Sequence, residues 1–235
     1  MTSAADYRSS LVSQLISAKV LTFGEFTLKS GRKSPYFLNS SFLHTSQAVR
    51  STAAAYAQVI STPPFTTSTG EPIFDVLFGP AYKGIPLCAS TMTELAHTDK
   101  DHKMDRVSYS FNRKEAKDHG EGGTIVGCPL KGRNCLIIDD VITSGKAMRE
   151  AVEIIQAQEG IVVGVVLLLD RQERLSEEEE RSTVGIARET MGVPVKAILE
   201  LKDLIEVFEA GSVPEVGPEE VKKLKEYRAK YAGKE

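Results

Sequence analysis

The sequence predicts an α/β fold in which a mostly parallel central sheet is flanked by helices. From Ile73 onward, short apolar segments alternate with segments of helical periodicity, an order typical of parallel strands connected by helices. The clearest strand is the run 161–169, IVVGVVLLL, which contains no polar residue. A strand that is apolar throughout fits a sheet buried on both faces. The 235 residues suffice for one domain with a sizeable core.

The first part of the chain predicts an accessory element ahead of this sheet. Tyr7, Leu11 and Leu15 recur at helical spacing, so a helix is expected over residues 5–19. The segment 26–39, FTLKSGRKSPYFLN, combines short apolar stretches with a Gly-bearing turn, and we expect a hairpin of two short strands there.

The remaining elements follow from periodicity, caps and turn residues. In chain order we expect a helix at 47–60 capped by Ser46, a proline-bearing surface loop at 61–72, a strand at 73–78, a helix at 85–97, strands at 106–111 and 134–139, a helix at 145–158 and the strand at 161–169. Four consecutive acids at 177–180 predict a solvated loop or helix start. Apolar residues at helical spacing after Pro218 predict a last helix that packs on the core or the N-terminal element.

We therefore expect a single domain over 1–235 with three parts. Residues 1–45 form the N-terminal helix and hairpin, residues 46–200 the α/β core, and residues 201–235 a C-terminal helical segment. The C-terminal segment is too short to hold a second enzymatic barrel of roughly 250 residues.

Composition excludes several classes of function. The net charge of −3 argues against a general nucleic-acid or membrane surface. Cys88, Cys128 and Cys135 show no C-x-x-C spacing, so reduced packing residues are expected rather than a zinc site or disulfide framework. The sequence shows neither a secretory leader pattern nor an apolar run of about 20 residues. A cytoplasmic protein is the expectation.

The most informative segment is 136–147, LIIDDVITSGKA, where a strand runs into Asp139 and Asp140. The small, hydroxyl-rich turn at 143–146 precedes a helix, so its N–H groups and the helix dipole would favour a phosphate. The two carboxylates are suited to accepting hydrogen bonds from vicinal hydroxyls or to facing a magnesium complex. The pattern indicates a ribose 5-phosphate site. An acidic loop followed by an ordinary helix cap would have the same local pattern.

Other phosphate fingerprints are missing from the sequence. The chain has no G-x-x-x-x-G-K-[ST] and no G-x-G-x-x-G after a strand, so neither a P-loop nor a dinucleotide-binding fold is indicated.

The segment 136–147 resembles the loop that binds phosphoribosyl pyrophosphate (PRPP) in the type I phosphoribosyltransferases. Three further segments narrow the resemblance to the orotate-specific members of that family: 26–39, 78–87 (FGPAYKGIPL) and 111–123 (FNRKEAKDHGEGG). The four segments span most of the chain in the family's order. The resemblance implies the type I fold, with a small hood formed largely by the N-terminal segment.

The same resemblance implies an activity. Orotate displaces pyrophosphate from C1 of PRPP and gives orotidine 5′-monophosphate, a step of pyrimidine biosynthesis. The leaving group is highly anionic and the ribosyl carbon becomes oxocarbenium-like, so cations are needed at one end of the site. Mg²⁺ is the implied cofactor, held mainly by PRPP and water and by no direct protein ligand.

Segment 78–87 follows a strand, and its glycines allow a turn tight enough to aim N–H groups at pyrophosphate. Tyr82 and Lys83 are the expected contacts, and the family's cis peptide in this turn would lie between Ala81 and Tyr82. A plain strand-to-helix turn with a surface lysine is the alternative.

Segment 111–123 carries Arg113, Lys114, Lys117 and His119 and ends in glycines. Such a segment packs poorly alone, so we expect a mobile lid that orders over the anionic substrate and excludes water. A solvated charged loop would have the same composition. In the family this loop closes over the neighbouring subunit's active site, and Lys117 matches its catalytic lysine. The resemblance therefore implies a homodimer with shared active sites.

The implied catalytic residues are Lys117, Asp139 and Asp140. The implied PRPP contacts are Lys29, Tyr82, Lys83, Arg113, Lys114, Lys117, His119, Asp139, Asp140, Val141, Ile142, Thr143, Ser144, Gly145, Lys146 and Ala147.

For orotate the implied contacts are Lys29, Phe37, Leu38, Thr143 and Arg171. Arg171 directly follows the last apolar strand, at the sheet edge where ligands gather, and its guanidinium can hold a carboxylate with two hydrogen bonds. Phe37 can cover a pyrimidine face. Bacterial members carry a second aromatic where this chain has Leu38.

Simpler roles exist for both cations of the orotate site. Lys29 could be a surface hairpin lysine, and Arg171 could form a salt bridge to Asp170 or Glu173.

Two other functions compete with orotate transfer. A transferase for a purine or another base is disfavoured because segment 26–39 follows the orotate pattern. A non-catalytic PRPP-sensing regulator of the same fold is disfavoured by the cations of segment 111–123, since a sensor does not need to shield a leaving group from water.

Overall fold

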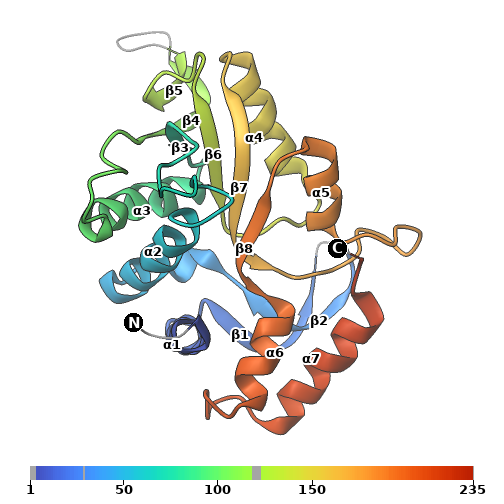
Figure 1. Ribbon diagram of the computed structural model, residues 1–235. Coiled ribbons are helices and arrows are strands. Elements are labelled where there is room, and N and C mark those ends of the chain that lie inside the picture. The colour runs from blue at the N-terminus through green and yellow to red at the C-terminus, as the bar shows by residue number, and fades with distance from the viewer. Residues whose placement is uncertain (1–3, 29, 118–122, 235) are drawn as a thin grey trace.

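In the computed structural model, which describes residues 4–28, 30–117 and 123–234, six strands form a central sheet (Figure 1). Their order is β5-β4-β3-β6-β7-β8, and every neighbouring pair is parallel except β4 and β5. The strands are β3 (Val76–Phe78), β4 (Ser108–Lys117), β5 (Gly123–Gly127), β6 (Asn134–Asp139), β7 (Ile161–Asp170) and β8 (Val195–Glu200). The predicted α/β class with a mostly parallel sheet is confirmed.

Helices cover both faces of this sheet (Figure 1). Along β6, Leu136 and Ile138 belong to one hydrophobic cluster and Ile137 to a second, so successive side chains enter opposite cores. The first core includes residues of α2 and α3, and the second includes residues of α4 and α5. The helices are α2 (Ser46–Ile60), α3 (Gly84–Thr98), α4 (Lys146–Ala157) and α5 (Thr183–Met191). Burial on both faces explains the continuous apolar strands of the sequence.

A smaller layer lies beyond the sheet and combines both ends of the chain. The antiparallel hairpin of β1 and β2 pairs Leu21 with Leu38, and α7 packs against β2. Its elements are α1 (Ala4–Ser17), β1 (Leu21–Thr27), β2 (Lys33–Leu38), a 3₁₀ turn η1 (Ser40–Phe42), α6 (Leu201–Glu209) and α7 (Pro218–Tyr231). The predicted first helix, hairpin and last helix are present, and α7 packs on the N-terminal element as one of the two predicted placements.

Several predicted boundaries are wrong: the first helix ends at Ser17 rather than 19, and the hairpin begins at Leu21 rather than 26. Helix α2 begins at Ser46, and Thr45 caps it by accepting a hydrogen bond from the Ala48 backbone N–H at 3.2 Å. Strand β3 is confined to Val76–Phe78, the residues paired with both β4 and β6, although the Asp75 backbone still bonds to Asn134 and Ser108. Strand β4 starts at Ser108 and continues past 111 to Lys117, into the predicted lid.

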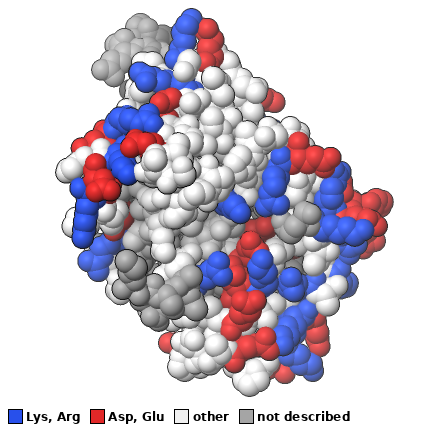
Figure 2. Space-filling view, in the orientation of Figure 1, with Lys and Arg blue, Asp and Glu red and all other residues white. Residues whose placement is uncertain are grey.

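The surface agrees with the modest net charge. On the face shown in Figure 2, Lys and Arg stand next to Asp and Glu along the edges, and the middle is largely uncharged. The acids at 177–180 lie outside any helix or strand, as expected for a solvated loop. Among the described helices, none is long and apolar enough to cross a membrane.

Candidate active site

The site is defined by three segments that follow neighbouring parallel strands. Strand β3 pairs with β6, and β6 pairs with β7. The turn 79–84 follows β3, the segment 139–147 ends β6, and Arg171 follows β7. Because parallel strands end at the same sheet edge, the three segments meet there, which is where open α/β sheets bind ligands.

Asp139 and Asp140 are both buried, 8 % and 6 % exposed. Asp140 accepts a hydrogen bond from Lys83 Nζ at 3.0 Å and another from the Ser40 hydroxyl. On the main chain, the Tyr56 hydroxyl donates to the Asp139 carbonyl at 2.7 Å. These contacts fix the carboxylates between the sheet, α2 and the turn after β3. Ser40 and Tyr56 were not identified from the sequence.

Burial, and then the charge of Asp140, raises the pKa of Asp139 to about 7. Two adjacent carboxylates are costly to ionise away from water. Lys83 and the Asp140 backbone N–H act in the opposite direction by favouring the ionised form. The pair is thus set for a ligand whose hydroxyl groups can donate hydrogen bonds to it.

The segment 141–147 has the form of a phosphate cradle. Gly145 caps α4 with φ +72° and makes no side-chain hydrogen bond to the helix. The Lys146 N–H donates to Ser144 Oγ at 3.4 Å, and the N–H groups that follow it in the first turn have no intrahelical partner. A Cβ there would lie 2.9 Å from Arg149 Nη1 and would meet a left-handed backbone. Thr143 and Ser144 are exposed, whereas the Ile142 side chain is buried in the second core. Ile142 can therefore meet a ligand through its backbone only.

The turn 79–84 is packed too closely for any side chain at its glycines. A Cβ on Gly79 would lie 2.3 Å from the Gly84 carbonyl oxygen, and one on Gly84 would lie 2.9 Å from the Ile138 oxygen of β6. The Ala81–Tyr82 peptide is cis, which confirms that expectation. The Ala81 N–H donates to Asn112 Oδ1 at 2.9 Å, so β4 supports the turn through a residue that the sequence reasoning missed.

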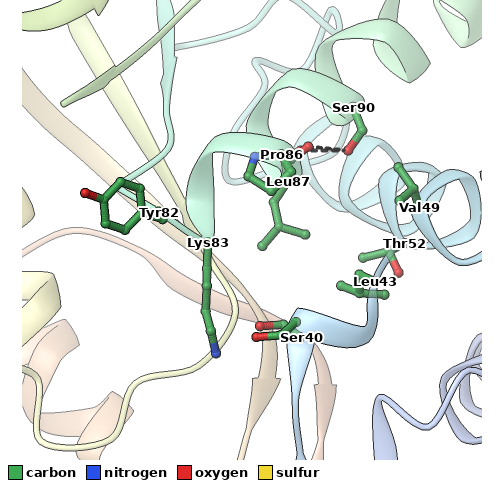
Figure 3. A pocket seen from close by; sticks show the side chains of 10 residues that line it. Ser40, Leu43, Val49, Thr52, Tyr82, Lys83, Pro86, Leu87 and Ser90 are labelled. Atoms are coloured by element: carbon green, nitrogen blue, oxygen red, sulfur yellow. Dashed lines mark hydrogen bonds between the residues drawn. The ribbon is translucent and has the colours of Figure 1, made fainter. Parts of the chain in front are cut away.

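Tyr82 and Lys83 project in different directions from this turn. Lys83 reaches from the start of α3 toward Ser40, whereas Tyr82 lies on the other side (Figure 3). Both line a cavity of about 220 Å³. Tyr82 is 71 % exposed, and Lys114 Nζ of β4 lies 5.8 Å from its ring centroid. The complete lining is Ser40, Ser41, Leu43, Val49, Thr52, Tyr82, Lys83, Pro86, Leu87 and Ser90.

The predicted lid is largely a strand. Residues up to Lys117 belong to β4, and β5 pairs with it, Lys117 opposite Gly123. The antiparallel pairing is regular up to Asn112 and shifts register between Asn112 and Lys117, across Arg113 and Lys114. Arg113 Nη1 donates to the Gly123 carbonyl at 3.3 Å. His119, the Lys117 side chain and Lys29 lie outside the described part of the chain.

On the orotate side, Arg171 forms the predicted alternative contact: its Nε lies 2.7 Å from Glu173 Oε1. Phe37 is 39 % exposed and stacks on Phe26 at 5.5 Å, so one aromatic surface is accessible. Leu38 is 8 % exposed and packs in the first core, because successive residues of β2 face opposite sides. Phe37 and Arg171 thus retain the exposure or the charge that a ligand requires, and Leu38 serves packing.

Residues 44–198 match the model of the phosphoribosyl transferase domain. Fold and site therefore define a phosphoribosyltransferase. The chain is 54 % identical to the orotate phosphoribosyltransferase of Coccidioides immitis, and the match covers all of both proteins. It belongs to the orotate phosphoribosyltransferase family.

Solved structures agree with this assignment. The orotate phosphoribosyltransferase of Francisella tularensis superposes with a TM-score of 0.78 at 33 % identity, over 95 % of this chain and all of that one. A Mycobacterium tuberculosis orotate phosphoribosyltransferase in complex with PRPP shares the fold, with a TM-score of 0.58 at 21 % identity over 84 % of this chain and 98 % of that one.

Proposed function

We propose that the protein transfers the 5-phosphoribosyl group from PRPP to orotate, giving orotidine 5′-monophosphate and pyrophosphate in pyrimidine biosynthesis. The observation that supports this best is that a tight turn, an acidic pair with a helix N-terminus, and a partly buried arginine meet at one sheet edge. Each suits a different part of the reacting complex: leaving group, phosphorylated sugar and acidic base.

Asp139 and Asp140 would accept hydrogen bonds from the ribose hydroxyls, and Thr143 to Ala147 would bind the 5-phosphate through backbone N–H groups and hydroxyls. The main chain of Val141 and Ile142 completes that cradle. Holding both ends of the sugar aligns C1 with the incoming base.

Tyr82 and Lys83 would bind pyrophosphate from the turn after β3, and Arg113 and Lys114 from β4 would add positive charge. Cations aimed at the leaving group stabilise the charge that develops as its bond to C1 breaks. The family resemblance assigns Lys117 and His119 to the same pyrophosphate end and gives Lys29 a contact with PRPP as well as with the base.

Mg²⁺ fits this donor set as a companion of PRPP. Within the described residues no group of three or more His, Cys, Asp or Glu could hold a metal ion, but the acidic pair offers the hard oxygen ligands that Mg²⁺ accepts directly or through water. When bound, the ion would neutralise phosphate oxygens.

For the base, Arg171 would hold the orotate carboxylate, Phe37 would cover the ring, and Lys29 and Thr143 would reach its polar edge. Leu38, next to Phe37 in β2, would make a weaker contact with the base than the aromatic residue of bacterial members.

We also propose a homodimer in which the β4–β5 arm completes the neighbouring site. A cytoplasmic location fits the three free cysteines, since thiols persist in a reducing compartment.

Loss of orotate absorbance on adding PRPP and Mg²⁺ to the purified protein tests the activity directly. We expect turnover that needs both additions. Folded protein that leaves orotate unchanged would refute the proposal, and equal turnover of a purine base would redirect it to another member of the superfamily.

The raised pKa of Asp139 predicts weaker PRPP binding in acid. The ribose hydroxyls need an ionised acceptor, and Asp139 gains its proton as the pH falls through about 7. We expect the Kd of the Mg–PRPP complex, measured by calorimetry, to rise roughly tenfold between pH 8 and pH 6. In Asp139→Asn, residue 139 cannot ionise, so any remaining pH dependence of the Kd comes from PRPP and from other groups. Identical pH profiles for wild type and this variant would contradict the role given to Asp139.

A further inference from the structure

The Arg171 side chain is held by several contacts, and two of its partners, Tyr227 and Glu173, belong to none of the predicted motifs. Its guanidinium carbon lies 4.4 Å from the Tyr36 ring centroid, and its Nη2 donates to Ser34 Oγ at 3.1 Å and to the Tyr227 hydroxyl at 3.4 Å. With Nε committed to Glu173, three contacts fix the plane of the group. Among the described residues no acceptor binds Nη1, so that amino group is left for a ligand.

Tyr227 and Glu173 close a ring of hydrogen bonds around the arginine. The Tyr227 hydroxyl receives a hydrogen bond from Arg171 Nη2 and donates one to Glu173 Oε1 at 2.8 Å. The same oxygen accepts from Arg171 Nε. Arg171 Nε binds Glu173 and Arg171 Nη2 binds Tyr227, and these two partners bind each other. Rotation of the guanidinium would therefore break both of its hydrogen bonds to the ring at once. Tyr227 lies on α7, so the C-terminal helix takes part in orienting a residue at the sheet edge.

The side chains of Arg32, Arg171 and Glu173 form a cluster whose charges do not balance. Glu173 also lies 3.6 Å from Arg32 Nη1, and the side chains of Arg32, Arg171 and Glu173 are 14 %, 10 % and 12 % exposed. Two guanidinium groups therefore share one carboxylate in a partly desolvated position, with an excess of one positive charge. A bound carboxylate would balance that charge, and a base without one would leave it uncompensated.

The main chain ties α7 to the segment that carries Arg171. The Arg174 N–H donates to the Tyr231 carbonyl at 2.9 Å, and the Gly233 N–H donates to the Gln172 carbonyl at 2.9 Å. A Cβ on Gly233 would lie 2.3 Å from the Ser182 nitrogen, so only glycine permits this approach. In Figure 1 the C-terminus and α7 lie at the right and lower right, where Figure 2 shows Lys and Arg next to Asp and Glu.

We propose that Tyr227 and Glu173 are positioning residues that hold Arg171 for the carboxylate of the base, and that α7 thereby contributes to the choice of an acidic pyrimidine. The inference rests on the proposed function and deepens it: the two residues act on the affinity for orotate through Arg171 and leave the PRPP site unchanged.

The test compares KM values for the two substrates. Tyr227→Phe, which removes one hydroxyl, should raise the KM for orotate on the order of tenfold with the KM for PRPP within about twofold. Glu173→Gln keeps the shape but also removes a negative charge beside the orotate carboxylate, so its rise in the KM for orotate should be smaller than that of Tyr227→Phe. Tyr231→Phe, a turn further along α7, is the matched control and should behave as wild type.

A double-mutant cycle separates positioning from general packing. In an Arg171→Ala background, Tyr227→Phe should have no further effect on orotate, because its only route is gone. Additive effects, equal rises in both KM values, or an unchanged KM in both single variants would overturn the inference. A wild-type protein that does not consume orotate would instead refute the proposed function, and the inference would fail with it.

Discussion

Replacing both Asp139 and Asp140 with asparagine is expected to lower kcat/KM for PRPP by a factor on the order of 10³, the largest effect of any change at the sugar site. Each carboxylate would lose a charge-assisted hydrogen bond to a ribose hydroxyl, and the site would lose negative charge near the developing oxocarbenium ion. Steady-state rates at varied PRPP and fixed, saturating orotate measure the change.

The Asp139→Asn half of this change should not unfold the protein. Asp139 has a folded pKa above its ordinary value, so its ionisation destabilises the folded state as the pH rises from about 4 to about 7. Asp139→Asn removes that cost, and we expect its midpoint of urea unfolding at pH 8 to equal or exceed that of wild type. Lost activity together with lost stability would mean that the pair serves the fold rather than the substrate.

The sheet and its site were predictable because both depend on short stretches of sequence. The apolar runs 134–139 and 161–169 and the polar residues that come after them determined which segments meet at the sheet edge. The cis peptide at Ala81–Tyr82 was predictable only by family resemblance, since nothing in the local residues requires it.

The supporting contacts were not predictable, because they join residues far apart in the chain. Asn112 binds a backbone N–H 31 positions away, and Tyr227 binds Glu173 54 positions away. Neither belongs to a recognisable motif. The β4–β5 pairing was not predicted for a related reason. The pattern of charged residues indicates which side chains are solvent-exposed, whereas strand pairing is made by backbone hydrogen bonds that any sequence can form.

Lys117→Ala is expected to lower kcat by a factor on the order of 10² or more, as for loss of one contact made in the transition state. The Lys117 backbone pairs with Gly123 at the far end of β4. Strand β3 pairs only with residues 108–110 of β4, so the rest of β4 and its partner β5 form an arm beyond β3. The KM for orotate should change little, because Arg171 follows β7 and Phe37 lies in β2, so neither belongs to the β4–β5 arm. Lys131→Ala, an exposed lysine paired with Glu159, is the control and should retain activity. Near-normal turnover in Lys117→Ala would mean that the catalytic cation lies elsewhere.

Mixed dimers reveal which subunit the arm serves. When Lys117→Ala chains are coexpressed with chains carrying Asp139→Asn and Asp140→Asn, half of the dimers pair one chain of each kind if association is random. If the arm completes the neighbouring site, one site of each mixed dimer has both an intact acidic pair and an intact lysine, and activity should recover to about a quarter of wild type. If the arm serves its own subunit, every site lacks one component and none recovers. Purification through two different tags isolates the mixed dimers, in which the recovered fraction should double to about half. Inactive mixed dimers would exclude a shared site. Each subunit would then use its own arm, so one site would still lack Lys117 and the other would still lack the acidic pair.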